Sequence, residues 1–245
     1  MSAEVKAVYL ARRHPGLTRE SFTDRWRRHG ALAMSLPMWR HTSGYAHGDV
    51  DPDPPRDRDG QLPDRWSGEH DAVGTVFMPS PEAFAAFHAH RDYPRLRNDE
   101  HGTFSGLIEE CAVLTTEWPV LERPGTTVRV LGFLVPAPGL TRVAFHERWA
   151  AHAGLVMRHE SLAGLLTRYV HNRSAASDAE PPAGSFAEVA GVAELGFASI
   201  ADRDAYLAHP DRAGLADDLA TFTDPARTVL VATNEVTMAV RTPPD

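Results

Sequence analysis

The chain has 245 residues, of which 42% are hydrophobic, and its formal net charge is −8. The acidic residues are scattered and no basic stripe occurs, so we expect no nucleic-acid partner. No apolar run approaches the length of a membrane span, and the first residues lack the pattern of a signal peptide. Cys111 is the single cysteine, which excludes a disulfide framework, and together these features predict a cytoplasmic protein without a membrane partner.

Strand and helix signals alternate along both halves of the chain. Residues 5–10 are rich in β-forming side chains, and Thr18 can cap a helix after the Pro15-Gly16 break. In the first half, strands are predicted at residues 5–10, 44–47, 70–78 and 108–118, and helices at 18–34 and from 81 onward, with a further helical segment after Pro94. The predicted order is therefore strand, helix, strand, strand, helix, strand. The second half repeats this order over residues 128–135, 142–159, 165–171, 188–197, 200–208 and 228–236. Polar segments at 49–68 and 174–182 are predicted to be loops.

The same motif surrounds the start of the first helix in each half. Pro-Gly-Leu-Thr-Arg occupies residues 15–19 and again 138–142, and the Phe, Arg, Trp, His and Leu at positions 22, 25, 26, 29 and 32 all recur 123 residues later. A gapless match of this many uncommon residues indicates a tandem duplication.

The duplicated element order predicts an α+β fold. Strand, helix, strand, strand, helix, strand is the ferredoxin-like βαββαβ arrangement, here in two tandem domains over residues 1–121 and 126–240 with a linker at 122–125. Each antiparallel sheet would carry helices on one face and leave the other bare. Because two bare faces in one chain can pack together, we predict a pseudo-dimeric α+β barrel.

The repeated motif resembles the signature of the EthD family of dimeric α+β barrel proteins. The matching residues are Arg13, 15–19, Phe22, Trp26 and 29–32, with further similarity at 44–47 and 191–197. The second half departs from the motif at 135–137, where Val-Pro-Ala replaces the Arg-Arg-His of 12–14, so we expect the working site in the first half. The resemblance implies the activities of this superfamily: cofactor-free monooxygenases, aromatic polyketide cyclases, dehydratases, lactone isomerases and haem-handling enzymes.

One face of each first helix carries an aromatic stripe that ends in a histidine. Phe22, Trp26 and His29 lie at i, i+4 and i+7, and Trp149 and His152 repeat the last two positions. Such a histidine can be a packing residue that bonds a backbone carbonyl, or a general acid/base near neutral pH. We expect His29 first, and His152 second, to act as the catalytic base.

A tyrosine and a histidine two residues apart share one face of the following strand in each half. Tyr45 and His47 are predicted to take part in catalysis, although the tyrosine could equally be an ordinary β-former whose hydroxyl reaches solvent. The remaining candidate residues are the aromatic and basic side chains expected to contact the substrate: Phe22, Trp26, His88, Arg13, Trp149, Tyr169 and His171.

The candidate residues favour acid/base chemistry on a small molecule. No cluster has metal-ligand spacing, no histidine is singled out as a haem ligand, and no phosphate-binding loop occurs, so we predict no metal or cofactor. An aromatic wall with few polar groups suits an aromatic or polyketide-like substrate. We predict a cofactor-independent lyase or cyclase that works by dehydration, cyclisation or isomerisation. A cofactor-free monooxygenase and a non-catalytic binder of small hydrophobic ligands are the alternatives, and such pseudo-dimers could pair into homodimers.

Overall fold

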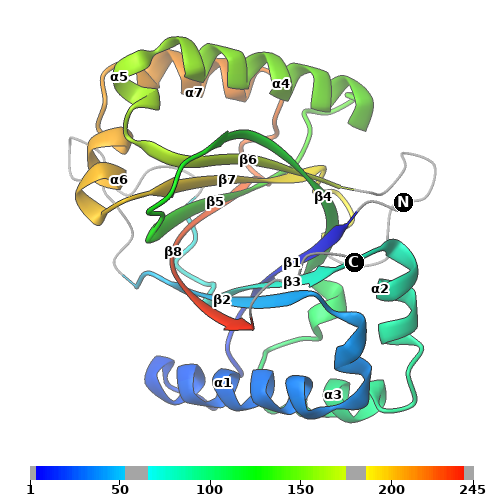
Figure 1. Cartoon of the computed structure of the whole chain (residues 1–245). Coiled ribbons are helices and arrows are strands. Elements are labelled where there is room, and N and C mark those ends of the chain that lie inside the picture. The colour runs from blue at the N-terminus through cyan, green and yellow to red at the C-terminus, as the bar shows by residue number, and fades with distance from the viewer. Residues whose placement is uncertain (1–3, 53–65, 175–185, 240–245) are drawn as a thin grey trace.

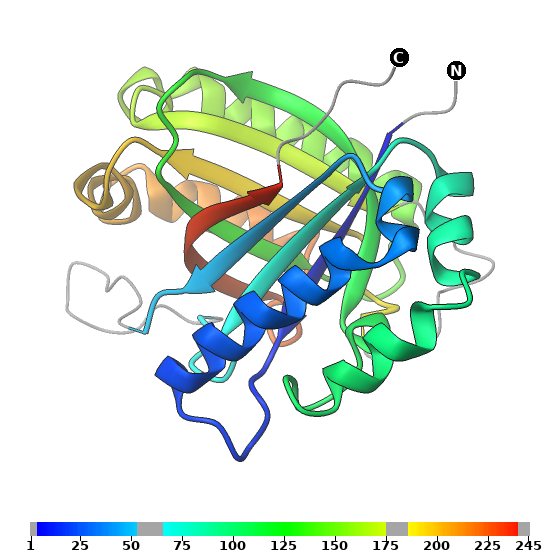
Figure 2. The ribbon, with the colours of Figure 1, turned by 60° about the horizontal axis from the view of Figure 1, so that its bottom comes forward.

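Eight strands in the described part of the chain close into one barrel, with helices packed against it from two opposite sides (Figure 1). The computed structural model of the protein describes residues 4–52, 66–174 and 186–239. In each half the helices lie on the outer face of that half's strands (Figures 1 and 2). The molecule therefore has three layers, with the barrel in the middle.

The elements follow the predicted order in both halves. In the first half they are β1 (Val5–Ala11), α1 (Arg19–Ser35), the 3-10 turn η1 (Pro37–His41), β2 (Gly44–Val50), β3 (Ala72–Met78), α2 (Pro81–His88), α3 (Tyr93–Glu100), the 3-10 turn η2 (Ile108–Glu110) and β4 (Ala112–Glu122). In the second half they are β5 (Val128–Leu134), α4 (Arg142–Arg158), α5 (Glu160–Ala163), β6 (Leu166–Ser174), β7 (Gly191–Phe197), α6 (Ile200–Leu207), α7 (Arg212–Ala220) and β8 (Val229–Ala239).

A threonine caps the first helix of each half: Thr18, as predicted, and its repeat Thr141. The hydroxyl of Thr18 accepts a hydrogen bond from the backbone N–H of Ser21, and Thr141 does the same for Ala144, both at 3.2 Å. The sequence did not predict α5 or α7, and it ended β2 at residue 47 instead of Val50. Most residues of the two predicted loops, 49–68 and 174–182, lie outside the described residues.

Two pairings between the halves close the barrel. The strands are ordered β4-β1-β3-β2 in the first half and β8-β5-β7-β6 in the second, which is the ferredoxin-like order. Strand β2 pairs antiparallel with β8, and β4 pairs antiparallel with β6, so neither sheet keeps an open edge. The predicted pseudo-dimeric α+β barrel is therefore confirmed. The segment predicted as a linker, 122–125, begins at the last residue of β4 and continues into the turn before β5, where Gly125 has a φ of 93°.

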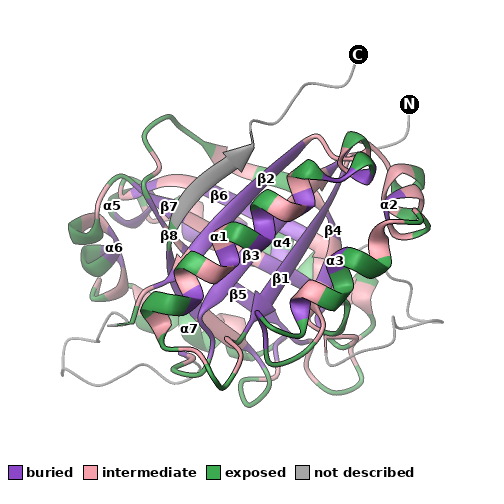
Figure 3. Cartoon of the chain, turned by 90° about the horizontal axis from the view of Figure 1, so that it is seen from below, coloured by how far each residue is buried: buried purple, intermediate pink, exposed green. Residues whose placement is uncertain are grey.

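Successive side chains of each strand alternate between the barrel interior and the helices. In β1, Val8 and Leu10 belong to an interior cluster with Leu131 and Phe133, whereas Tyr9 packs outward against α1. Figure 3 shows the buried strands of the first half beneath α1 and α3. The outer face of these strands is the floor on which the site described below is built.

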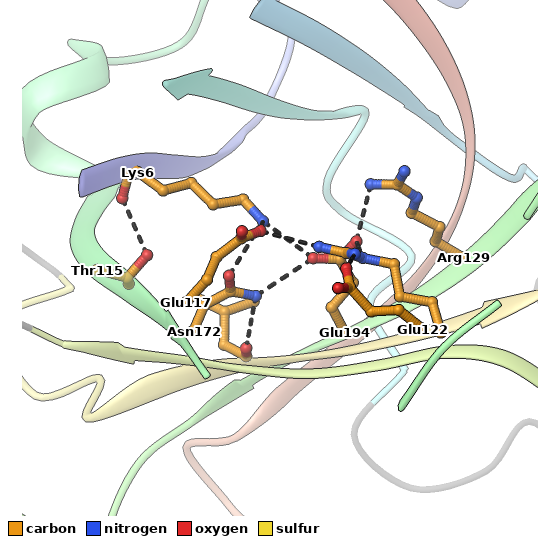
Figure 4. A network of polar contacts seen from close by, with 9 residues as sticks. Lys6, Thr115, Glu117, Glu122, Arg129, Asn172 and Glu194 are labelled. Atoms are coloured by element: carbon orange, nitrogen blue, oxygen red, sulfur yellow. Dashed lines mark hydrogen bonds and ion pairs between the residues drawn. The ribbon is translucent and has the colours of Figure 1, made fainter. Parts of the chain in front are cut away.

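A network of buried charges fills another part of the barrel interior and joins the halves (Figure 4). The carboxylate of Glu194, on β7, lies 3.0 Å from Nζ of Lys6 and 2.8 Å from guanidinium nitrogens of both Arg129 and Arg168. Lys6, on β1, also donates to Glu117 at 2.9 Å. Burial alone would raise the pKa of Glu194, but the three cations outweigh it and hold that pKa far below its usual range.

Replacing Glu194 with glutamine should destabilise the fold by about 3–5 kcal/mol, because three cations inside the barrel would lose the carboxylate that they share. Urea unfolding followed by circular dichroism measures the change. Glu69→Gln is the control, since its ion pair with Arg12 is exposed and should contribute less than about 1 kcal/mol. Equal unfolding midpoints for Glu194→Gln and the wild type would contradict this account of the network.

Candidate active site

A cavity of about 510 Å³ lies between the outer face of the first-half strands and the three helices that cover them. Figure 2 shows α1 and α3 crossing these strands. Most of the wall is apolar, with contributions from Val76, Phe84 and Leu114. Its titratable side chains are His29 on α1, Tyr9 on β1, Tyr45 on β2, His88 on α2, Tyr93 and Glu100 on α3, and Glu109 on η2.

His29 is held in place by Asp99, which projects from the neighbouring helix α3. Its Nδ1 lies 2.8 Å from Oδ2 of Asp99. Arg25, one turn earlier on α1, donates to the two oxygens of the same carboxylate at 2.9 and 2.6 Å. The ionised carboxylate fixes the proton of His29 on Nδ1, so the lone pair of the ring lies on Nε2. In the part of the chain that the structure describes, this Nε2 has no hydrogen-bond partner.

The surroundings of His29 favour its neutral form. Burial lowers the pKa of the imidazole, against the hydrogen bond and charge of Asp99, which raise it. Burial raises the pKa of Asp99, but hydrogen bonds from Arg25 and His29 outweigh this and bring the pKa below its ordinary value. A neutral imidazole that donates Nδ1–H to a carboxylate and carries a free Nε2 can act as a general base.

Two buried tyrosine hydroxyls meet at the floor of the cavity. The hydroxyl oxygens of Tyr9 and Tyr45 are 3.0 Å apart, and Nε1–H of Trp26 donates to that of Tyr9 at 3.1 Å. One hydroxyl proton joins the two oxygens, so the other remains to be donated to a ligand. Burial raises the pKa of both tyrosines, and they therefore act as donors and not as bases.

The ring of Tyr9 lies directly on the backbone of β3. A Cβ atom at Gly74 would come within 1.8 Å of Cζ of this ring, so only glycine leaves room for it. In the second half Gly132 takes the position of Tyr9, and the side chain of Leu230 lies against it, 2.9 Å from where a Cβ atom would stand. The hydroxyl pair is thus a feature of the first half.

The histidine–aspartate pair occurs in both halves. Nδ1 of His152 lies 2.7 Å from Oδ2 of Asp218, and burial likewise lowers the pKa of His152. As in the first half, the histidine comes from the long first helix and the aspartate from the helix packed beside it, here α4 and α7. The pair itself therefore does not distinguish the halves.

The space in front of the pair does distinguish them. The corresponding cavity of the second half measures about 90 Å³. Counted from the aspartate of each pair, Leu219 stands where the first half has Glu100, and Leu207 stands where it has His88. Leucine side chains thus occupy positions that carry titratable groups in the first half. That the working site lies in the first half stays a prediction.

Several residues predicted from the sequence line one of the two cavities. His29, Tyr45 and His88 line the first, and His152, Trp149 and Tyr169 line the second. All six were expected to act on or contact a substrate. Their positions leave the first three as the candidates for chemistry, because the second cavity is small.

Other predicted residues lie outside the first cavity. His47 stacks on Trp26 with ring centroids 3.8 Å apart, and its Nδ1 lies 2.5 Å from Nη1 of Arg27. Burial and the charge of Arg27 lower the pKa of His47 to about 2, so this ring stays neutral. His171 stacks on Trp149 in the same way, at 3.9 Å. Both histidines lie beyond a tryptophan and do not line either cavity.

Phe22 and Arg13 do not line the first cavity and instead contact other residues of the protein. Phe22 stacks on Trp26, with ring centroids 5.8 Å apart, in the core between α1 and the strands. The backbone N–H of Arg13 donates to Asp71 at 2.9 Å, and the Arg13 guanidinium pairs with the same carboxylate. Asp71 thus holds Arg13 just beyond the end of β1. Arg13 was expected to contact the substrate, but it does not line the cavity.

Sequence reasoning missed Tyr9, Asp99 and Glu100. Asp99 is 70 residues from His29, in a segment for which the sequence indicated only a further helix. The signal that could have identified it was the duplication, because a leucine followed three residues later by aspartate recurs with Asp218.

The described residues show neither a metal-binding cluster nor a membrane-spanning helix. Residues 4–52, 66–174 and 186–239 contain no group of three or more His, Cys, Asp or Glu side chains arranged to hold a metal ion. None of the helices within these same ranges combines the length and the apolar character needed to cross a membrane.

The chain matches a family model twice. The model of the EthD domain matches residues 14–107 and residues 137–226, and these segments include both copies of the repeated motif. The protein belongs to the EthD family. The resemblance inferred from the motif is therefore confirmed, and the chain carries two EthD domains in tandem. No match was found among curated proteins.

Solved structures share the EthD protein's fold at low sequence identity. An anthrone oxidase-like protein superposes with a TM-score of 0.58 at 10% identity, over 98% of this chain and 93% of the other. A candidate monooxygenase from Fusobacterium nucleatum gives 0.57 at 8% identity over 99% of each chain. A candidate chlorite dismutase gives 0.52 at 10% identity over 96% of each. At such identities these likenesses establish the fold alone.

Asp99→Asn in this EthD protein should lower the pKa of His29 further, because the carboxylate is the group that raises it against burial. Nitrogen NMR of the histidine rings, followed across pH, measures the change. Asp218→Asn is the matched control and should affect His152 while leaving His29 as it is. A rise in the pKa of His29 on losing the Asp99 charge would contradict the electrostatics described above.

Proposed function

We propose that this protein is a cofactor-independent oxygenase that acts on a flat aromatic molecule with an acidic C–H group, bound in the first-half cavity. The observation that carries the proposal is a histidine–aspartate pair that faces about 510 Å³ of apolar space, while the equivalent pair faces about 90 Å³. The histidine of the first half thus has room to meet a ligand, whereas its equivalent in the second half has little.

The orientation of His29 supports its role as the base. Asp99 and Arg25 fix the ring through Nδ1, and the free Nε2 belongs to a residue of the cavity wall. A proton on the bound molecule can therefore pass to Nε2 without any rearrangement of α1 or α3. General-base catalysis of this kind accelerates a reaction by about 10²–10⁴-fold.

The cavity wall supports an aromatic substrate. Aromatic and aliphatic side chains supply most of it, which favours a flat apolar ring system. The hydroxyl pair of Tyr9 and Tyr45 offers one proton to an oxygen on that ring system. An oxygenated polycyclic aromatic molecule meets both conditions.

The reaction needs a base and molecular oxygen. His29 removes a proton from the acidic carbon, and the electron pair of the C–H bond passes into the ring as an enolate. The enolate carbon bonds to O₂, which is thereby reduced to a peroxide and takes the proton from His29. Loss of the second C–H proton with cleavage of the O–O bond gives a carbonyl group and water. One CH₂ group and one O₂ thus become one C=O group and one H₂O.

The fold relatives add support and a test substrate. One is named an anthrone oxidase-like protein and another a candidate monooxygenase. We take anthrone as the test molecule because it has a CH₂ group made acidic by a carbonyl across the ring. Dehydration, cyclisation and isomerisation begin with the same proton transfer but consume no oxygen.

His29→Gln should lower the rate of anthrone-dependent oxygen uptake by about 10²–10⁴-fold, because the amide cannot accept the proton. An oxygen electrode and the absorbance of the quinone product measure the rate. His152→Gln makes the same change beside the small second cavity and should alter the rate less than threefold, a margin of about 0.6 kcal/mol.

The outcomes separate the alternative functions. Equal losses in the two variants would contradict a site confined to the first half. Hydrogen–deuterium exchange of the anthrone CH₂ without oxygen uptake would favour a lyase or isomerase. Tight anthrone binding with neither exchange nor uptake would favour a non-catalytic binding protein.

A further inference from the structure

Glu100 is a buried acid in the cavity wall that the reaction described above does not use. It lies at the end of α3 and is 2% exposed. Its Oε2 accepts a hydrogen bond from the backbone N–H of Ile108 at 2.9 Å. Its Oε1 has no hydrogen-bond partner among the residues that the structure describes. One carboxyl oxygen is therefore anchored and the other remains available in an apolar cavity.

We propose that Glu100 is the catalytic acid of this site: it binds the substrate as a neutral carboxylic acid and donates its proton to the carbonyl oxygen of the bound ring. This inference rests on the proposed function, in which His29 is the base. It deepens that function by requiring a substrate with a carbonyl oxygen as well as an acidic C–H group.

The two residues divide one tautomerisation between them. The C–H bond breaks, and its proton goes to Nε2 of His29. The freed electron pair forms the C=C bond of an enol, while the carbonyl oxygen takes the proton of Glu100. When O₂ then bonds to the carbon, the enol returns its O–H proton to Glu100, and His29 gives its proton to the peroxide. Glu100 is protonated at the start and the end, so protons and electrons balance.

The groups around Glu100 favour its neutral form. Burial raises the pKa of the carboxyl to about 7, and the charges of Glu109 and Asp99 act in the same direction. The Ile108 hydrogen bond and the charge of Arg97 oppose them. The titratable and charged groups that face it from the surrounding elements are Tyr45 on β2, Tyr93, Arg97 and Asp99 on α3, Glu109 on η2, and Cys111 ahead of β4.

The second half serves as a comparison within the same chain. Leu219 follows Asp218 just as Glu100 follows Asp99. The half with the small cavity therefore keeps the histidine–aspartate pair and has an apolar residue in place of the acid. A carboxyl group buried for structural reasons alone would need no such space in front of it, whereas an acid that meets a substrate does.

A binding measurement tests the acid without any turnover. The probes are 9-fluorenone, a flat molecule with one carbonyl oxygen and no ionisable group, and fluorene, which lacks the oxygen. Quenching of tryptophan fluorescence gives the affinity of each. The affinity for fluorenone should fall about tenfold between pH 6 and pH 8.5, because ionised Glu100 cannot donate a hydrogen bond. The affinity for fluorene should change less than half as much on a logarithmic scale.

Glu100→Gln removes the titration and keeps the shape of the side chain. Its affinity for fluorenone should not depend on pH over this range. Glu110→Gln is the control. Glu110 is an exposed carboxylate of the neighbouring turn η2 and does not line this cavity, so this variant should keep the wild-type pH dependence. A wild-type affinity for fluorenone that is the same at pH 6 and pH 8.5 would overturn the proposal, and this result needs no variant to fold.

Turnover of anthrone provides the second measurement. The wild-type rate should fall as pH rises through about 7, as Glu100 loses its proton. Glu100→Gln should lose this basic limb and turn over at least tenfold more slowly, and an unchanged rate would show that Glu100 is not the acid. If the wild type neither consumes oxygen nor exchanges the CH₂ protons, the proposed function fails, and the fluorenone result still decides whether Glu100 donates to a bound carbonyl.

Discussion

The pairing of β2 with β8 and of β4 with β6 is the constraint on which the rest of the structure depends. A four-stranded ferredoxin-like sheet has two open edges and one bare face, and each of these would otherwise meet water or another chain. Joining the edges converts two incomplete sheets into one barrel and turns both bare faces inward. The charges of Lys6, Glu117 and Glu194 then become buried between the halves, where each has a partner from the other half: Lys6 and Glu194 pair with one another, and Glu117 pairs with Arg168.

Because the barrel is continuous, the outer faces of the two halves are free to differ. Both keep the long first helix, the stacked tryptophan and histidine, and the histidine–aspartate pair. The first half opens a cavity in front of this pair and surrounds it with tyrosine, histidine and glutamate. The second half fills most of that space with leucine. The divergence at the cavity concerns side chains of its wall, whereas the order of the strands in the sheet is the same in both halves.

Sequence reasoning predicted the fold because the fold depends on patterns within short segments. The motif around Thr18 and its copy at Thr141 identify two first helices, and the element order then limits the topology to paired ferredoxin-like units. The cavity residues that were predicted, His29, Tyr45 and His88, are those that spacing along a single helix or strand places on one face. Asp99 and Glu100 reach the cavity because α3 packs beside α1, and no local pattern encodes that contact. His47 does not line the cavity, because spacing on a strand specifies a face but not the tryptophan that covers it.

Covalent fusion of the two halves also changes how the barrel responds to dilution. A barrel assembled from two separate chains exists only above a protein concentration set by its dissociation constant. Here the strand pairs that close the barrel lie within one molecule, so the effective concentration of one half near the other is fixed by the short turn around Gly125. The inner faces stay covered at any dilution, even when a cell holds only a few copies of the protein.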